Sequence, residues 1–263
     1  MSAPLLDVQN LSVTFDPGDA SPPAVRGVSF SVDPGETVGV VGESGSGKSV
    51  TAFSILRLLP PQGRVVGGRV VFEGRDLLQL SEAEMRGVRG ARIGLIFQEP
   101  MTALDPVMRI GDQISEALTV HDRLSRSDAR TRAVELLEAV RIPDAARRAR
   151  DYPHQLSGGM RQRAMIAVAL ACHPPLIIAD EPTTALDVTI QAQVLALLKD
   201  LQARFGLSLL LITHDFGVIA EMADRVVVMC RGELVEQGSV RTILREPVHA
   251  YTRGLLAAVP GRA

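Results

Sequence analysis

The 263-residue sequence has little of what disulfide-stabilised or nucleic-acid-binding proteins require. Its two cysteines, Cys172 and Cys230, lie far apart and show no metal-ligand spacing, so we interpret them as ordinary buried residues. The formal net charge of −2 gives no general attraction to nucleic acid or anionic lipid. We therefore expect a reduced protein that does not bind nucleic acid.

Long hydrophobic runs are also missing. The longest, Ala164 to Cys172, is shorter than the ~20 residues that a membrane-spanning helix needs. The first ten residues lack the basic region and apolar core of a signal peptide, which predicts a cytoplasmic chain. Any membrane role is expected to come through a partner.

The sequence contains alternating strand and helix patterns that predict an α/β fold. A small antiparallel sheet is expected near the N-terminus, a parallel sheet in the core, a closing hairpin and a mostly helical tail. Strands are predicted at 11–15, 25–32, 37–41, 65–72, 93–97, 176–179, 207–213, 226–229 and 234–237. Helices are predicted at 49–59, 110–119, 127–140, 158–172, 188–205 and within 239–256, with a helical insert over about 100–165.

A glycine-rich stretch follows the strand predicted at 37–41 and precedes a helix. Gly42-Glu43-Ser44-Gly45-Ser46-Gly47-Lys48-Ser49 matches the phosphate-loop (Walker A) pattern G-x-x-x-x-G-K-[ST]. In such a loop, backbone N–H groups and the helix N-terminus bind phosphates, Lys48 reaches the β- and γ-phosphates, and Ser49 ligates Mg²⁺. A turn that binds nothing is the other interpretation, but the strand–loop–helix context favours an ATP site extending to Val50.

Two adjacent carboxylates, Asp180 and Glu181, follow the apolar strand predicted at 176–179. Ligands bind at the carboxyl ends of strands in open α/β sheets. Asp180 is therefore expected to serve the Mg²⁺ shell, and Glu181 to act as general base on the water that attacks the γ-phosphorus. The alternative, a solvated loop, is less consistent with a chain that also has a phosphate loop.

Ser157, Gly158 and Gly159 open an almost wholly apolar helix. A serine N-cap followed by two glycines exposes N–H donors and a hydroxyl, which predicts a second phosphate site. The plainer interpretation is an ordinary helix cap.

Taken together, the Walker A stretch, LSGGMRQR at 156–163, LIIADEPTTALD at 176–187 and His214 resemble the motif set of an ABC (ATP-binding cassette) nucleotide-binding domain. The resemblance implies one P-loop NTPase domain with a mixed-sheet core over 1–99 and 166–263, a small antiparallel β subdomain, and a helical subdomain over about 100–165. It also implies a dimer in which the LSGG signature of one subunit closes on the ATP held by the other.

The same resemblance assigns roles to single residues. Gln98 is similar to the Q-loop glutamine that contacts Mg²⁺ and water, and His214 to the switch histidine near the γ-phosphate, although a histidine at a strand end can also be inert. Asp187 resembles the D-loop aspartate at the nucleotide. Phe15 takes the place of the aromatic residue that stacks on adenine, where tyrosine is more usual.

Two segments indicate which subfamily of ABC proteins the sequence resembles. FQEPMTALDPV at 97–107 and HAYTRGLL at 249–256 resemble the oligopeptide, dipeptide and nickel importers. This implies a peripheral ATPase at the cytoplasmic face of the membrane, with a second cassette, two permeases and an extracytoplasmic substrate-binding protein. Because the sequence stops at Ala263 without a cysteine-bearing extension, no iron–sulfur cluster is expected. The accessory ATPase of a phosphonate carbon–phosphorus lyase complex remains the alternative.

Overall fold

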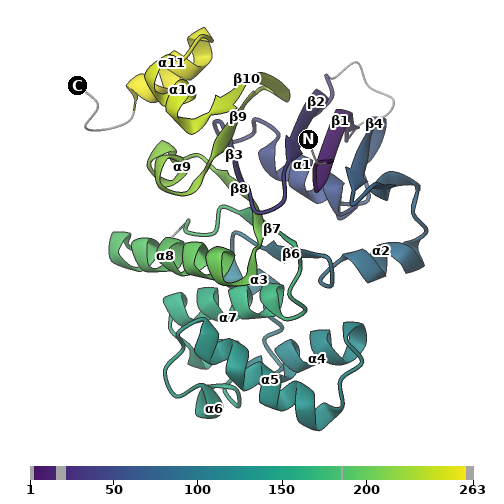
Figure 1. The fold of residues 1–263 in the computed structure, drawn as a ribbon, viewed down its shortest axis with the longest axis vertical. Coiled ribbons are helices and arrows are strands. Elements are labelled where there is room, and N and C mark those ends of the chain that lie inside the picture. Colours follow the sequence, from purple (N-terminus) through teal and green to yellow (C-terminus); the bar gives the residue numbers. More distant parts are fainter. Residues whose placement is uncertain (1–2, 16–21, 185, 259–263) are drawn as a thin grey trace. The chain divides into compact units, whose positions relative to one another are not determined.

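The computed structural model describes residues 3–15, 22–184 and 186–258 (Figure 1). The chain forms two compact units, one of residues 1–85 and 208–263 and the other of residues 86–207. Both contain strands and helices, which confirms the predicted α/β class. Within the described ranges, no helix combines the length and the apolar character needed to cross a bilayer.

The first unit contains an antiparallel sheet in the order β2-β1-β4-β5. Its strands are β1 (Leu6–Thr14), β2 (Val25–Val32), β4 (Arg64–Phe72) and β5 (Arg75–Asp76). β1 begins five residues before the predicted strand, because the pairing shifts register around Asn10, whose φ is 48°. This bulge moves the buried positions from Leu6 and Val8 to Leu11 and Val13, which obscures the alternation in the sequence.

A mixed set of strands in the same unit positions the glycine-rich loop. β3 (Thr37–Val41) pairs in parallel with β8 (Ser208–Thr213) and β9 (Arg225–Cys230), and every residue of β3 is buried. β9 and the antiparallel β10 (Glu233–Ser239) form the predicted hairpin. Val41 lies opposite both Thr213 and Val228, so β3 and β8 end together while β9 continues to Cys230.

The helices of the first unit differ from prediction at their ends, and the helix over Phe216–Met222 was not predicted. α1 stops at Ile55 rather than at residue 59, because Arg57 is left-handed with φ 52° and the Leu58 N–H bonds back to the Phe53 carbonyl at 2.8 Å. The other helices are η1 (Leu77–Gln79), α9 (Phe216–Met222), α10 (Val240–Arg245) and α11 (Ala250–Ala257); α2 (Glu82–Val88) leads into the second unit.

The second unit combines two parallel strands with a group of helices. β6 (Ile93–Ile96) pairs with β7 (Leu176–Asp180), and Ile96 lies opposite Ala179. Helices α4, α5 and α7 pack against one another (Figure 1). The helices of this unit are α3 (Pro100–Ala103), α4 (Ile110–His121), α5 (Arg126–Ala139), α6 (Ala145–Arg148), η2 (Pro153–Gln155), α7 (Gly158–Leu170) and α8 (Val188–Phe205). The subdomain boundaries at about 100 and 165 stay a prediction.

Helix α7 lies directly on strand β6. A Cβ atom added at Gly94 would lie 2.4 Å from the backbone oxygen of Ala169, too close for any side chain. The missing side chain of Gly94 therefore sets the distance between β6 and α7.

We expect Gly94→Ala to lower the free energy of unfolding by about 1–3 kcal/mol, because the strand must move away from backbone atoms. Gly87→Ala in the exposed face of α2 is the matched control, since a Cβ there meets nothing within 4 Å. That control is expected to be neutral or slightly stabilising. Chemical denaturation measures both, and equal stability of the two variants would contradict the packing argument.

Candidate nucleotide-binding and catalytic residues

The glycine-rich loop connects β3 to α1 and holds a buried lysine. The Lys48 side chain is in α1, and Lys48 is only 5% exposed. Its Nζ donates hydrogen bonds to the carbonyl oxygens of Gly42 and Glu43, each at 2.8 Å. Gly42 is required here, since a Cβ would lie 2.2 Å from the Met229 oxygen. The loop therefore keeps a positive charge at the carboxyl end of β3.

The loop also contains a buried hydroxyl that fits an anionic ligand. Ser46 Oγ is buried and has no hydrogen-bond partner among the described residues, which ordinarily costs about 1–3 kcal/mol. Glu43, Ser44 and Gly45 are exposed, whereas Gly47 caps α1 without a side-chain acceptor. A phosphate in the loop could accept from the Ser46 hydroxyl and from the start of the helix.

His214 and Phe15 lie on other elements of the same unit. His214 is exposed and directly follows β8, whose last residue is in register with Val41 of β3. The histidine and the glycine-rich loop therefore leave the sheet at the same edge. Phe15 follows β1, and its ring borders Gly63: a Cβ there would lie 3.0 Å from Phe15 Cε1. The adenine-stacking role of Phe15 stays a prediction.

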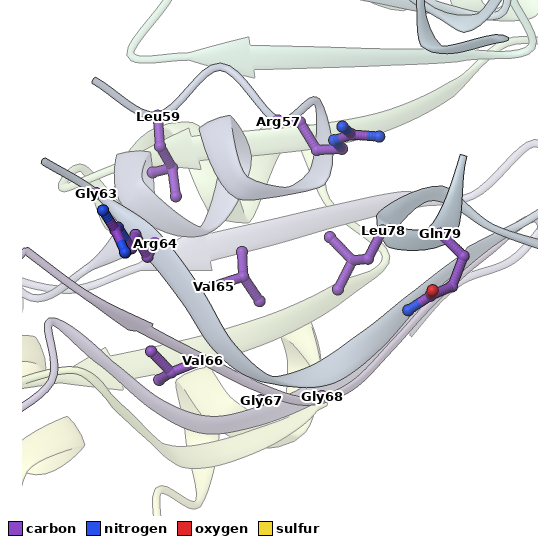
Figure 2. Close-up of a pocket in the computed structure, with 10 residues that line it drawn as sticks. All are labelled: Arg57, Leu59, Gly63, Arg64, Val65, Val66, Gly67, Gly68, Leu78 and Gln79. Atoms are coloured by element: carbon purple, nitrogen blue, oxygen red, sulfur yellow. The ribbon is translucent and has the colours of Figure 1, made fainter. Parts of the chain in front are cut away.

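A separate pocket of about 610 Å³ lies between the end of α1 and β4 (Figure 2). Its lining combines basic, polar and apolar side chains: Arg57, Leu59, Arg64, Val65, Leu78 and Gln79. Arg57 donates to the carbonyl oxygens of Leu77 and Leu80, so its guanidinium is part of the local backbone network. The predicted nucleotide-binding residues do not line this pocket.

In the second unit, the structure brings two predicted catalytic residues together. Because Ile96 is opposite Ala179, the segments that follow β6 and β7 leave the same sheet edge. Gln98 Nε2 donates to Glu181 Oε2 at 3.2 Å, directly beyond the buried Asp180. The structure thus brings into contact two residues that were each predicted to be catalytic, and their catalytic roles stay predictions.

Thr184 is a neighbour of Glu181 that sequence reasoning missed. Its hydroxyl donates to the same Oε2 at 2.7 Å, and its N–H bonds to the Glu181 carbonyl at 3.1 Å. Glu181 is left-handed with φ 46°, a conformation that costs about 1–2 kcal/mol for a residue with a Cβ. The sequence did offer one signal for Thr184: a hydroxyl residue three positions after Glu181, in a polar turn, can bond back to its side chain. The carboxylate is thus held in place from two sides.

The start of α7 carries the other predicted phosphate contacts. Ser157 Oγ accepts from the Met160 N–H at 3.4 Å, and both Ser157 and Gly158 are exposed. The helix is tied to the segment after Glu181, because the buried Gln162 amide donates to the Pro182 carbonyl. The cap is the plainer role that we considered, and the phosphate role of Ser157, Gly158 and Gly159 stays a prediction.

Asp187 also has a local structural role. Its Oδ1 accepts from the Ile190 N–H at 2.9 Å and caps α8, while the residue itself is exposed. Its predicted function at a nucleotide is not tested by this contact.

The cysteines are less buried than predicted. Cys172 and Cys230 are both half-buried and both free, so neither forms a disulfide. Burial, with a smaller contribution from Asp122, raises the pKa of the Cys172 thiol to about 11. Cys172 is therefore an unreactive thiol at neutral pH, consistent with a packing role.

Comparison with known proteins places this chain in a family. The model of the ABC transporter family matches residues 25–184. A probable peptide ABC transporter ATP-binding protein of Sinorhizobium fredii is 58% identical over 98% of this chain and 77% of that protein. The oligopeptide transport ATP-binding protein OppD of Bacillus subtilis is 55% identical over 97% of this chain and 72% of its own length. The dipeptide transport ATP-binding protein DppD of the same organism is 54% identical.

Solved structures agree with the sequence comparison. The dimeric ATP-binding cassette MJ0796, in a post-hydrolysis state with ADP and phosphate, superposes with a TM-score of 0.79 and is 31% identical. It covers 90% of this chain and 99% of its own. These matches confirm the P-loop NTPase fold that the motifs predicted. The chain therefore belongs to the ABC transporter family, as an ATP-binding cassette with ATPase activity.

Proposed function

We propose that this chain is the ATP-hydrolysing subunit of a peptide importer. The observation that carries the proposal is its 54–58% identity, over nearly its whole length, to ATP-binding proteins named for peptide, oligopeptide and dipeptide transport. These names support peptides and give no support to nickel or to the carbon–phosphorus lyase alternative. The importer would include a second cassette, two permeases and an extracytoplasmic substrate-binding protein, with this chain peripheral at the cytoplasmic face.

Nucleotide binding is assigned to residues 42–50 and Phe15. Lys48 Nζ donates hydrogen bonds to the carbonyl oxygens of Gly42 and Glu43. The charged oxygens of an ATP phosphate are stronger acceptors and would take the place of these carbonyl oxygens. The buried Ser46 hydroxyl, which has no hydrogen-bond partner in the described part of the chain, supports the same assignment. Phe15 would offer a ring face to the adenine.

The Mg²⁺ ion that accompanies ATP is assigned to Ser49, Gln98 and Asp180. Hydroxyl, amide and carboxylate oxygens are the ligands this ion prefers. When bound, the ion neutralises charge that develops on the phosphates.

Catalysis is assigned to Glu181, with Gln98 and His214. Hydrogen bonds from Gln98 and Thr184 fix Glu181 Oε2, so the carboxylate is oriented before any water is bound. An oriented carboxylate can accept the proton of an attacking water without reorganising. His214 would contribute at the γ-phosphate from the end of β8.

The working unit would be a pair of cassettes. Ser157, Gly158 and Asp187 are exposed and so could contact the nucleotide of a second subunit. The dimeric form of the related cassette supports this arrangement.

Glu181→Gln should reduce ATP turnover by about 10²–10⁴-fold, because the amide cannot accept the proton. ATP binding should persist, so filtration or equilibrium dialysis with labelled ATP should recover bound, unhydrolysed nucleotide. Glu138→Gln on the exposed face of α5 is the matched control and should hydrolyse ATP normally. Wild-type turnover by Glu181→Gln would remove Glu181 from the mechanism.

The substrate assignment predicts that transport substrate controls ATPase activity. In vesicles that contain the native membrane complex, a peptide-loaded binding protein should stimulate ATP hydrolysis several-fold. The same binding protein without peptide, or a nickel-loaded one, should not. Stimulation by nickel alone, or recovery of this chain only with soluble enzymes, would contradict the peptide-importer proposal.

A further inference from the structure

The tail helix α11 is anchored on the hairpin that carries β10. Glu236 of β10 accepts hydrogen bonds from the Val248 and His249 N–H groups at 2.7 and 3.1 Å. Burial raises the pKa of Glu236, but the hydrogen bonds from the Val248 and His249 N–H groups and the charge of nearby His249 outweigh burial and hold the pKa below its usual value. Thr252 and Leu256 are buried beneath the helix. Helix α11 is therefore held in a fixed position within the first unit.

The position of α11 brings one of its side chains, Tyr251, to the phosphate loop. The Tyr251 hydroxyl accepts a hydrogen bond from the Glu43 N–H at 3.1 Å, across 208 positions of sequence. Tyr251 also packs against the apolar cluster that contains Val41, the last residue of β3. Burial is the largest of the causes that raise the pKa of Tyr251, so the hydroxyl is protonated at neutral pH.

The contact acts on a peptide group that also holds Lys48. The peptide between Gly42 and Glu43 has its oxygen bonded to Lys48 Nζ at 2.8 Å and its N–H bonded to Tyr251. A planar peptide that is held at both ends cannot rotate without breaking one of these bonds. The orientation that Tyr251 fixes is therefore the orientation that places the Lys48 ammonium.

We propose that Tyr251 is a positioning residue for the phosphate loop, which fixes the Gly42–Glu43 peptide and through it Lys48. The inference rests on the proposed assignment of residues 42–50 to ATP. In the absence of the hydroxyl, the Glu43 N–H loses its partner and the peptide gains freedom, so the loop must be ordered when the nucleotide binds. Nucleotide affinity should fall, whereas the chemical step, which is assigned to residues outside this contact, should not.

Tyr251→Phe tests this directly, since it keeps the ring and removes only the hydroxyl. We expect KM for ATP and Kd for ADP to rise about 3- to 10-fold, the effect of losing one hydrogen bond of ordinary strength. The value of kcat at saturating ATP should stay within about twofold. Tyr152→Phe, at the only other tyrosine of the chain, is the matched control. Unchanged KM, or a loss confined to kcat, would overturn the proposal.

A spectroscopic measurement keeps Tyr251 intact. In Tyr152→Phe protein, Tyr251 is the sole tyrosine, so ¹³Cζ-tyrosine labelling gives one resonance. Lys48→Ala should shift this resonance without any nucleotide, because the lysine and the hydroxyl share a peptide group. Lys199→Ala, at the only other lysine, should leave it in place. If Lys48→Ala leaves the resonance unshifted, the tail helix only packs against the loop, and the positioning role of Tyr251 is wrong.

Lys48→Ala also separates this inference from the assignment of the loop. If that variant retains wild-type ATP hydrolysis, the loop assignment itself is wrong. If Lys48→Ala is inactive and Tyr251→Phe has wild-type KM, the loop assignment stands and only the role of Tyr251 is lost. Thermal unfolding of each variant confirms that the fold is intact before the kinetics are compared.

Discussion

The register of parallel strands is the constraint on which the candidate site depends. β3 and β8 end together because Val41 lies opposite Thr213, and β6 and β7 end together because Ile96 lies opposite Ala179. The segments that follow such strands leave the same edge of their sheet, so a residue placed just beyond each strand reaches its neighbour. Gln98 and Glu181 meet in this way, and the glycine-rich loop shares an edge with His214. Strand pairing thus brings residues that are far apart in the sequence close enough to act on one ligand.

The charged residues at these edges are held by fixed partners. Lys48 is bonded to two carbonyl oxygens, and the Glu181 carboxylate takes donors from Gln98 and Thr184 while its backbone stays left-handed. Groups that are oriented in advance have less to reorganise when a substrate arrives. Two features are unfavourable for folding alone, as is common at sites that serve a ligand: the strained backbone of Glu181, and the buried Ser46 hydroxyl, which lacks a partner among the residues that the structure describes.

Local patterns in the sequence predicted those features that depend on one element at a time. The bounds of β2, β3 and α8 follow from their apolar spacing, and the phosphate loop and the carboxylate pair follow from their place after a strand. The bulge at Asn10 was not predictable from alternation, since it changes the phase of the alternation itself. Thr184 was missed although its hydrogen bond to Glu181 is local, within one turn. Tyr251 was missed for another reason: it acts through a hydrogen bond to Glu43, which is 208 positions away and is brought near by tertiary packing.

A crystal structure of the chain with Mg²⁺ and a non-hydrolysable ATP analogue tests the central claim most directly. The account predicts that the phosphates contact Lys48 Nζ and the backbone N–H groups at the start of α1. It also predicts that a water beside the γ-phosphate is hydrogen-bonded to Glu181. A nucleotide bound elsewhere, for example in the pocket beside Arg57 and Arg64, with Lys48 still on the carbonyl oxygens of Gly42 and Glu43, would contradict it.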